Sequence, residues 1–268
     1  NRTVLENQSY FDQELWSKIV DLGWTGIRIP EEFGGLGLGH LELCVIAEEL
    51  GRFLAPVPFS SSVYLFTEAV IKYGSEEMKK SLLPKLVSGD IVGTLAVTED
   101  LFAPSKENIE LSYNSGKING KKIAVPDASI ATHALVVAKS SGGISLQIAD
   151  LSDQGVSIEH QENIDESRGH FSITFNDVKT ESIGDEISGW DIYESIINQA
   201  AVLFAYEQIG GSQASLDMAV NYAKERYAFG RPIGSYQAIK HKLADMYIAL
   251  TLAKSNCYYA AWALSTDS

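Results

Sequence analysis

A cluster of basic residues stands out in a chain that is otherwise acidic. The sequence has 21 Lys and Arg residues against 35 Asp and Glu residues, a formal net charge of −14. Between positions 224 and 242 this balance is reversed, and Glu225 is the only acid. An arginine can bind a phosphate through two parallel hydrogen bonds, so the cluster predicts an anion site. The alternative is a solvated loop and helix face that binds nothing. The cations are Lys224, Arg226, Arg231, Lys240 and Lys242.

Two further features could contact a ligand. Thr98 follows the apolar residues 95–97 and precedes an irregular loop. A threonine at a strand end offers a hydroxyl and backbone amides to a flat heterocycle, although it can equally be an ordinary strand end. Phe229 and Gly230 lie inside the basic cluster. They add an aromatic face and a point where backbone can approach a ligand closely.

Other catalytic patterns are missing from the sequence. The five histidines do not have the spacing of a metal site, and the two cysteines occupy core positions of predicted helices. There is no P-loop, no G-x-S-x-G motif and no G-x-G-x-x-G motif. We therefore expect no bound metal, and neither a nucleophilic triad nor a dinucleotide-binding βαβ unit.

Composition narrows the class of protein further. A chain of 268 residues with 45% hydrophobic content can bury a sizeable core in one or two domains. Its acidity argues against general binding of nucleic acid or anionic membrane. With two cysteines, no secretory signal and no apolar run of about 20 residues, we expect a cytoplasmic protein. The chain lacks an initial Met and stops at a polar run, so we expect one or both ends to be missing.

Hydrophobic spacing divides the chain into three parts. We predict an N-terminal helical domain over 1–92, a β-barrel-like middle domain over 93–186 and a C-terminal helical bundle over 187–268, an α+β arrangement. In the first part Ser75 is a candidate N-cap, and Gly51 with the prolines at 56 and 58 is expected to end a helix. The apolar stripe of that helix comprises Leu43, Ile46, Ala47, Leu50 and Leu54.

The middle and last parts differ in hydrophobic period. Two stretches alternate apolar with polar residues as half-buried strands do, and Asn119-Gly120 is expected at a hairpin turn. Several short strands then favour an antiparallel sheet or a small barrel. The final stripe has unbroken 3–4 spacing and predicts a long helix packed nearly antiparallel to its neighbour. The strand residues are Phe171, Ile173, Phe175, Ile144, Leu146 and Ile148, and the stripe is Ile239, Leu243, Met246, Leu250, Ala253, Cys257, Ala260 and Leu264.

A series of short motifs runs along essentially the whole chain. They are residues 22–24, 29–37, 47–51, 83–84, 88–89, Ala96-Val97-Thr98-Glu99, Asn119-Gly120-Lys121-Lys122, 222–223, Glu225-Arg226, Phe229-Gly230-Arg231-Pro232-Ile233-Gly234 and Gln237-Ala238-Ile239-Lys240-His241. Each motif is weak alone, but their order and spacing together are specific. Together they resemble the acyl-CoA dehydrogenase family.

The resemblance implies a helical domain, a central antiparallel β-domain and a helical bundle that surround an FAD. It also implies α,β-dehydrogenation of an acyl-CoA thioester. In that reaction a glutamate removes the α-proton, the β-hydrogen leaves as hydride to the flavin N5, and hydrogen-bond donors stabilise the developing enolate. The family normally passes electrons to an electron-transferring flavoprotein. Its subunits share FAD sites in a dimer of dimers, here a homotetramer or a heterotetramer.

The resemblance also assigns residues. Val97 and Thr98 match the loop that contacts the flavin ring, and Val125 and Pro126 match a second segment that covers the ring. Arg226, Phe229 and Gln237 match residues that reach the FAD of a neighbouring subunit, Arg226 towards its pyrophosphate. Asn198 is a possible contact to the CoA arm.

Some positions depart from the family pattern. Ala124 and Pro126 replace the usual Trp and Thr, and the loop at 100–105 contains no glycine. Ala200 and Ala201 stand where a minority of members place the catalytic base, and we identify no catalytic base in the sequence.

Three functions therefore stay open. The first is an FAD-dependent acyl-CoA dehydrogenase that lacks its C-terminal segment here. The second is a subunit without a base that completes a partner's FAD site in a heteromeric enzyme. The third is an acyl-CoA oxidase.

Overall fold

Two compact units make up the chain. The computed structural model describes residues 2–7, 9–165 and 167–266. The first unit, here called the β-rich unit, comprises Asn1–Leu38 and Pro56–Ala200. The second, the helical unit, comprises Gly39–Ala55 and Ala201–Ser268. Both units are therefore assembled from two separate stretches of the sequence.

Short helices open the β-rich unit, and two of them have side-chain N-caps, one of which the sequence predicts. The Ser75 hydroxyl accepts a hydrogen bond from the Met78 amide at 3.1 Å, which confirms the predicted N-cap. The Asp12 side chain accepts a hydrogen bond from the Leu15 amide at 2.9 Å and caps α2. The helices are α1 (Arg2–Asn7), α2 (Gln13–Asp21), η1 (Trp24–Gly26), η2 (Glu31–Phe33), the π-helix η3 (Ser60–Thr67), α4 (Glu68–Tyr73), α5 (Glu76–Val87) and the first part of α6 (Gly189–Glu225).

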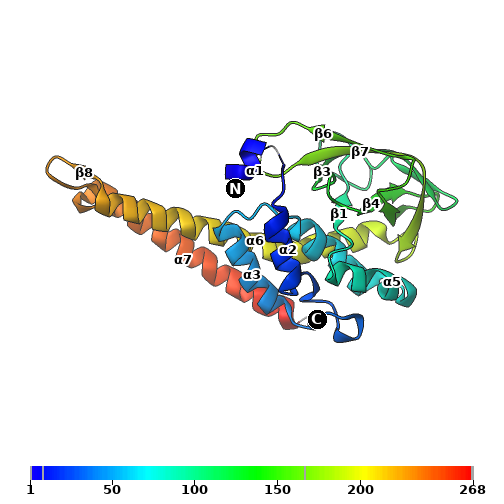
Figure 1. Cartoon of the computed structure of the whole chain (residues 1–268), viewed down its shortest axis with the longest axis horizontal. Coiled ribbons are helices and arrows are strands. Elements are labelled where there is room, and N and C mark those ends of the chain that lie inside the picture. The colour runs from blue at the N-terminus through cyan, green and yellow to red at the C-terminus, as the bar shows by residue number, and fades with distance from the viewer. Residues whose placement is uncertain (1, 8, 166, 267–268) are drawn as a thin grey trace. The chain divides into compact units, whose positions relative to one another are not determined.

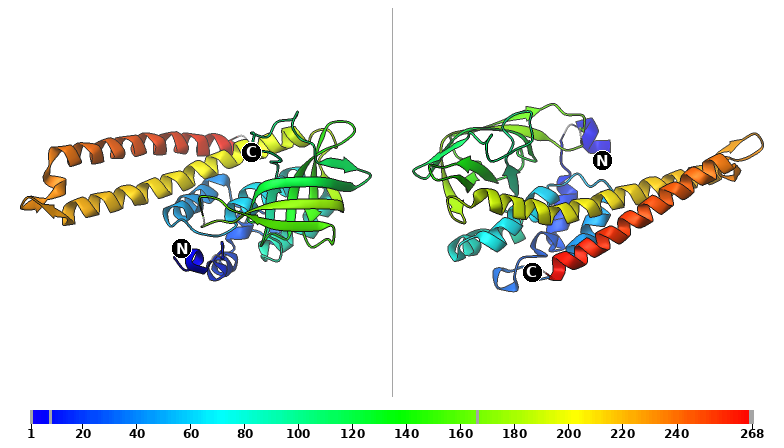
Figure 2. Two further views of the ribbon diagram at one scale, coloured as in Figure 1. Left: turned by 90° about the horizontal axis from the view of Figure 1, so that it is seen from above. Right: turned by 180° about the vertical axis from the view of Figure 1, so that it is seen from behind.

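The strands of this unit close on themselves. Pairings run from β4 to β2, β3, β7, β5 and back to β4, while β1 pairs with β4 and β6 with β7. Figure 2 shows these strands curving around one another. The enclosed core includes Ile118, Val136 and Ile173, all fully buried. This confirms a central β region between helical segments. The strands are β1 (Gly93–Ala96), β2 (Ser112–Asn114), β3 (Lys117–Pro126), β4 (His133–Lys139), β5 (Ile144–Asp150), β6 (Val156–Gln161) and β7 (His170–Ile183).

The sheet differs from the predicted one in its pairing and burial. Most pairings are antiparallel, but β4 runs parallel to both β1 and β2. Strand β5 was expected to be half-buried, yet Ser145 and Gln147 on its second face are also buried. The start of α6 covers that face, since a Cβ on Gly189 would lie 2.3 Å from the Ser145 carbonyl carbon.

The hairpin turn also lies at a different dipeptide. Ser115 and Gly116 have φ of 51° and 79°, and they connect β2 to β3 as a two-residue turn. Asn119 and Gly120, the predicted turn, lie inside β3 at an irregularity of register. The Asn119 side chain is bound there to Asp177 of β7, with 3.0 Å from Nδ2 to Oδ1. The prediction was wrong because the hydrogen bonds of Asn119 to Asp177 keep this dipeptide inside the strand.

Two long helices dominate the helical unit. The second part of α6 and α7 (Gln237–Thr266) run side by side as an antiparallel hairpin (Figure 1). Ile209 and Leu216 of α6 pack against Leu250 of α7 in one cluster. The predicted long helix and its antiparallel packing are thus confirmed. The remaining elements are α3 (His40–Arg52), β8 (Tyr227–Ala228), β9 (Arg231–Pro232) and the 3₁₀ turn η4 (Ile233–Ser235).

Helix α3 packs against α6 through glycines. A Cβ on Gly210 of α6 would lie 1.8 Å from the Glu48 carbonyl oxygen of α3. A Cβ on Gly51 of α3 would lie 2.0 Å from the Glu207 carbonyl oxygen of α6. The two glycines allow the backbones of α3 and α6 to approach closely. Helix α3 ends at Arg52, one residue after Gly51 and before the prolines at 56 and 58, close to the expected end. None of the helices formed by described residues has the length and hydropathy needed to cross a membrane.

We predict that Gly210→Ala lowers the free energy of unfolding by about 1–3 kcal/mol, because the new methyl group collides with backbone. The matched control is Gly211→Ala, where the Cβ would lie 3.5 Å from the Gly51 carbonyl oxygen, an ordinary contact. That control should be neutral or stabilising by up to about 1 kcal/mol, the usual preference of a helix for alanine. Urea unfolding followed by circular dichroism measures both. Equal stability of the two variants would contradict the close approach.

Candidate functional site

The structure brings two of the predicted segments together in the β-rich unit. Val97 and Thr98 follow β1, while Val125 and Pro126 end β3. The Ile123 amide donates to the Thr98 carbonyl oxygen at 2.8 Å. The Thr94 hydroxyl of β1 donates to the Pro126 carbonyl oxygen at 2.6 Å. These hydrogen bonds join the end of β1 to the end of β3.

Thr98 keeps hydrogen-bonding capacity at this junction. Its carbonyl oxygen is occupied by Ile123, but no hydrogen bond to another described residue uses its amide or its hydroxyl. The side chain is partly exposed, whereas Val97 is buried. The loop therefore presents an N–H donor and a hydroxyl from a fixed backbone, a suitable edge for a polar heterocycle.

An irregularity in β3 shapes the second segment. The register between β3 and β7 shifts between Lys122 and Val125. Ala124 there has φ of 51°, a conformation that a non-glycine residue seldom adopts. Its amide donates to the Gln161 side-chain oxygen at 2.7 Å, which holds the distorted backbone. Bulges of this kind redirect the residues that follow, here Val125 and Pro126.

A buried ion pair lies directly behind the first segment. The Lys122 side chain is fully buried, and its Nζ lies 2.6 Å from Glu99 Oε1. The same ammonium donates to the Val97 carbonyl oxygen at 3.0 Å. Glu99 also accepts from the backbone amides of Glu110, at 2.8 Å, and Leu111, at 3.1 Å. One lysine and one glutamate thus join the loop after β1, the segment at 110–111 and β3.

Burial lowers the pKa of Lys122 to about 8 from its usual 10.5, and the hydrogen bond and charge of Glu99 oppose that shift. Sequence reasoning missed this pair, although both residues lie in motifs that it singled out. The signal was available in the alternation of β3. Lys122 stands four residues after the buried Ile118, which places both side chains on the inward face.

A second polar cluster follows Pro126. The Asp127 carboxylate is almost fully buried, pairs with the Arg168 guanidinium and accepts from the Ser61 hydroxyl. Arg168 also donates to the Ser60 hydroxyl at 2.9 Å. This cluster connects the end of β3 to the start of η3. Sequence reasoning missed it too, since nothing in the spacing relates residue 168 to residues 60–61.

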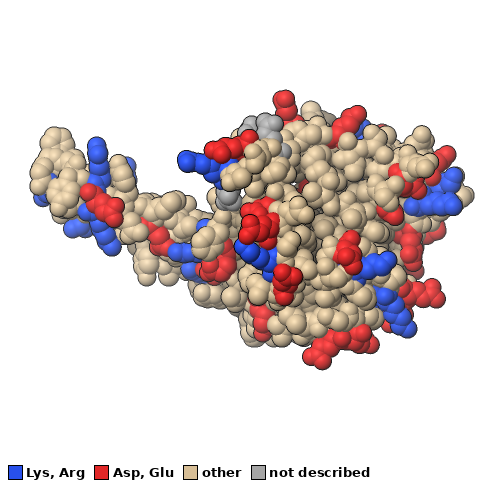
Figure 3. Space-filling model, in the orientation of Figure 1, with Lys and Arg blue, Asp and Glu red and all other residues tan. Residues whose placement is uncertain are grey.

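Three other predicted residues lie together at the end of the helix hairpin. Arg226 follows α6, Phe229 lies between β8 and β9, and Gln237 begins α7. All three are exposed, and Phe229 is 97% exposed. Figure 3 shows blue side chains gathered at this end of the hairpin. Among the described residues Arg226 has no ion-pair partner, so its charge is available to an anion.

The turn at this end is held by its own contacts. Phe229 and Gly230 have φ of 53° and 77°, which closes the β8–β9 hairpin. The Arg231 guanidinium lies 4.0 Å from the centroid of the Tyr236 ring, and the Tyr236 hydroxyl donates to the Ala228 carbonyl oxygen at 2.9 Å. Arg231 is therefore engaged within the turn. Asn198, the predicted CoA contact, is an exposed residue of α6 in the β-rich unit.

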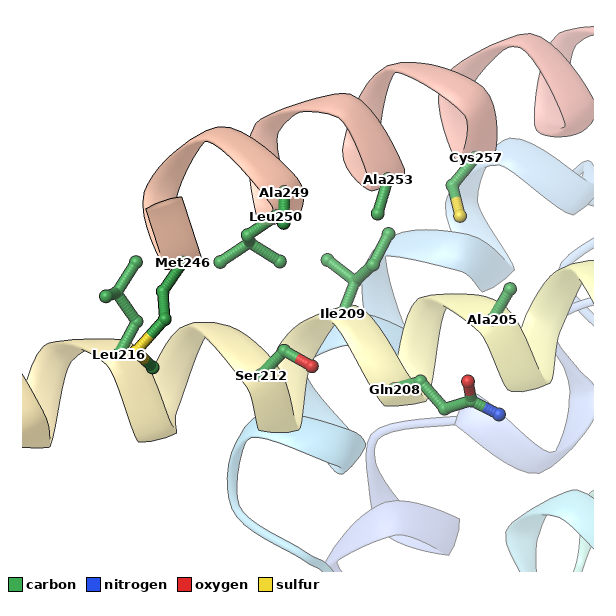
Figure 4. Close-up of a pocket in the computed structure, with 10 residues that line it drawn as sticks. All are labelled: Ala205, Gln208, Ile209, Ser212, Leu216, Met246, Ala249, Leu250, Ala253 and Cys257. Carbon is green, nitrogen blue, oxygen red and sulfur yellow. The ribbon is translucent and has the colours of Figure 1, made fainter. Parts of the chain in front are cut away.

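An apolar groove of about 470 Å³ runs between α6 and α7 in the helical unit. Figure 4 shows Ile209 of α6 facing Leu250 and Ala253 of α7 across it. Gln208 and Ser212 provide its polar side-chain groups. The α7 side of the groove includes part of the predicted stripe, which therefore faces α6. Among the described residues no group of three or more His, Cys, Asp and Glu side chains could hold a metal.

Comparison with known proteins now identifies the fold. The family profile for the acyl-CoA dehydrogenase N-terminal domain matches residues 2–90, and that for the C-terminal domain matches residues 188–268. The chain belongs to the acyl-CoA dehydrogenase family. The mitochondrial isovaleryl-CoA dehydrogenase of Oryza sativa subsp. japonica is 32% identical to it, over 93% of this chain and 65% of the relative. The chain thus spans less than two thirds of that relative's length.

Two solved structures place this family member among similar folds. One, described as the FAD complex of PigA, has a TM-score of 0.89 and 25% identity, covering 97% of this chain and 73% of that chain. The other is the ChsE4-ChsE5 complex from Mycobacterium tuberculosis, with a TM-score of 0.86 and 28% identity, covering 96% of this chain and 70% of that chain.

We predict that Lys122 makes the stability of this acyl-CoA dehydrogenase family member depend on pH. Its folded-state pKa of about 8 lies below the ordinary 10.5, so above pH 8 the unfolded chain binds more protons. The contribution of Lys122 to the free energy of unfolding therefore increases as the pH is raised from 8 to 10.5. It decreases over the same range when the pH is lowered, and it is absent below pH 8. A pKa shift of this size corresponds to about 3 kcal/mol.

Urea unfolding of the wild type and Lys122→Met at several pH values measures this contribution as a difference. The free energy of unfolding of the wild type, minus that of Lys122→Met, should increase as the pH rises from 8 to 10.5. Lys121→Met is the control, because that side chain is about half exposed. A difference between wild type and Lys122→Met that stays constant with pH would refute the assignment.

Proposed function

We propose that the protein acts in FAD-dependent α,β-dehydrogenation of an acyl-CoA thioester. The observation that carries the proposal is the junction of β1 and β3. There the Thr98 amide and hydroxyl have no hydrogen-bond partner among the described residues, next to Val125 and Pro126. Family membership and a similar chain described as an FAD complex support the same cofactor.

The residues present fit the two ends of FAD. The flavin ring is flat with a polar edge, and the Thr98 amide and hydroxyl supply donors for that edge. The pyrophosphate is an anion, and Arg226 is an exposed cation without an ion-pair partner in the described part of the chain. Gln237 and Phe229 at the same end would contact the adenosine half. In our proposal this group serves the FAD of a neighbouring subunit.

In the reaction these residues bind and orient. Thr98 would hold the edge of the flavin ring, Val125 and Pro126 would cover the ring, and Arg226 would neutralise phosphate charge. Asn198 would contact the CoA arm. When bound, the flavin supplies a hydride acceptor. We assign no catalytic base among the described residues, and we propose that electrons leave through an electron-transferring flavoprotein.

A second candidate function is a subunit that completes a partner's FAD site in a heteromeric assembly without performing chemistry. One observation favours it: among the similar structures is a complex of two differently named chains, ChsE4 and ChsE5. We do not carry the oxidase alternative further, because the similar structure described as a prolyl acyl carrier protein oxidase is 20% identical and its likeness concerns the fold alone.

The visible spectrum of the purified protein distinguishes the two candidates. If the subunit is catalytic, we expect bound yellow flavin that bleaches when acyl-CoA is added without oxygen. Repeating the measurement with straight-chain and branched acyl-CoA thioesters shows which acyl groups the protein accepts. A protein that acquires flavin only when it is co-expressed with a homologue supports the non-catalytic subunit. A protein that binds no flavin under either condition would refute both.

We predict that Arg226→Ala weakens FAD binding about tenfold or more, because a charge-assisted hydrogen bond to phosphate is lost. Fluorescence titration of flavin-free protein with FAD measures the dissociation constant. Lys242→Ala removes a cation of the same cluster that has no assigned contact, and it should leave the constant nearly unchanged. Unaltered FAD affinity in Arg226→Ala would count against the phosphate assignment.

A further inference from the structure

The buried Lys122 ammonium is unusual in what it contacts. A buried amine is costly to dehydrate and is retained only where hydrogen bonds and a counter-ion satisfy it. Its two partners, Val97 O and Glu99 Oε1, lie on either side of Thr98 in the sequence, at 3.0 and 2.6 Å. The lysine therefore holds the backbone of the residue that the proposed function places against the flavin.

Two successive carbonyl groups of this loop bind β3. Lys122 binds the Val97 carbonyl, and the neighbouring Ile123 amide binds the Thr98 carbonyl at 2.8 Å. A peptide plane whose carbonyl is fixed also fixes the direction of its N–H. Holding the Val97 carbonyl therefore sets where the Thr98 amide points.

The Glu99 carboxylate holds the far side of the loop. It accepts the amides of Glu110 and Leu111, and a hydrogen bond to a carboxylate is stronger than one between neutral groups. Lys122 is surrounded by this carboxylate on one side and by β7 on the other, where its register partner is Ile173. Glu99 is thus its charged partner among the described residues.

From this arrangement we infer that Lys122 is a positioning residue for the flavin. Its ammonium fixes Val97 and Glu99 so that the Thr98 amide and hydroxyl stay available for the ring. The inference rests on the proposed function. Lys122 itself is fully buried, so it would act on the flavin through the loop and not by direct contact.

The test compares Lys122→Met with the double variant Glu99→Gln/Lys122→Met. The single variant leaves the partly buried Glu99 carboxylate without its cation, which destabilises the fold. The double variant removes both charges and should recover most of the thermal stability, yet it still lacks the donor to the Val97 carbonyl. We therefore expect the double variant to fold like the wild type while its dissociation constant for FAD stays raised about tenfold. Lys121→Met should match the wild type.

A merely structural lysine would give another result. In that case the double variant would regain wild-type FAD affinity together with its stability, and this outcome would overturn the inference. The visible circular dichroism of the bound flavin adds a readout of ring geometry, which should change in the double variant and not in Lys121→Met.

Hydrogen exchange in the chain without added FAD separates the inference from the proposed function. If Lys122 holds the loop, the Ile123 amide, which is bound to Thr98, should exchange faster in the double variant than in Lys121→Met. Should the wild type bind no FAD, the proposed function fails, and this exchange still decides whether Lys122 positions the loop. Unchanged protection of Ile123 would overturn the inference.

Discussion

The ion pair of Lys122 and Glu99 is the constraint on which the candidate site depends. Removing an ammonium from water is expensive, and the cost is offset only while the amine keeps all of its partners. Those partners belong to the loop after β1, so the loop cannot shift without leaving a buried charge unpaired. The same pair fixes the segment at 110–111 through two amide hydrogen bonds. The positions of Val97 and Thr98 are therefore more firmly determined than those of an ordinary strand end.

The helical unit presents its candidate residues in a different way. Arg226, Phe229 and Gln237 are exposed at the end of a long hairpin, and the turn that carries them is held by local contacts such as Arg231 over Tyr236. These exposed side chains are accessible to a molecule from outside the unit. In the function proposed above, the rigid junction of the β-rich unit would bind the flavin end of one FAD, and the exposed cationic turn of the helical unit would bind the phosphates of a neighbouring subunit's FAD.

The sequence was sufficient for the features that depend on local patterns. The Ser75 cap, the apolar stripe of α7 and the β character of 170–183 follow from side-chain type and period. It was insufficient where a partner far along the chain decides the structure. The burial of Ser145 depends on the start of α6, and the role of Gly51 depends on the backbone of Glu207. The alternation of β3 directs Lys122 inward, but its counter-ion Glu99 belongs to another segment, and without that partner a charged residue is assigned to the surface.

The glycine contact between α3 and α6 has a consequence for biosynthesis. Helix α3 emerges from the ribosome early, but the surface on which it packs lies after Ala200, beyond the whole β-rich unit. Until that surface has been made, the apolar face of α3 has no native partner within the helical unit. Such late, non-local pairing slows folding and leaves an apolar segment exposed, and exposed apolar segments are prone to aggregation. The helical unit is thus completed only after the β-rich unit has been synthesised, and α3 waits longest for its partner helix.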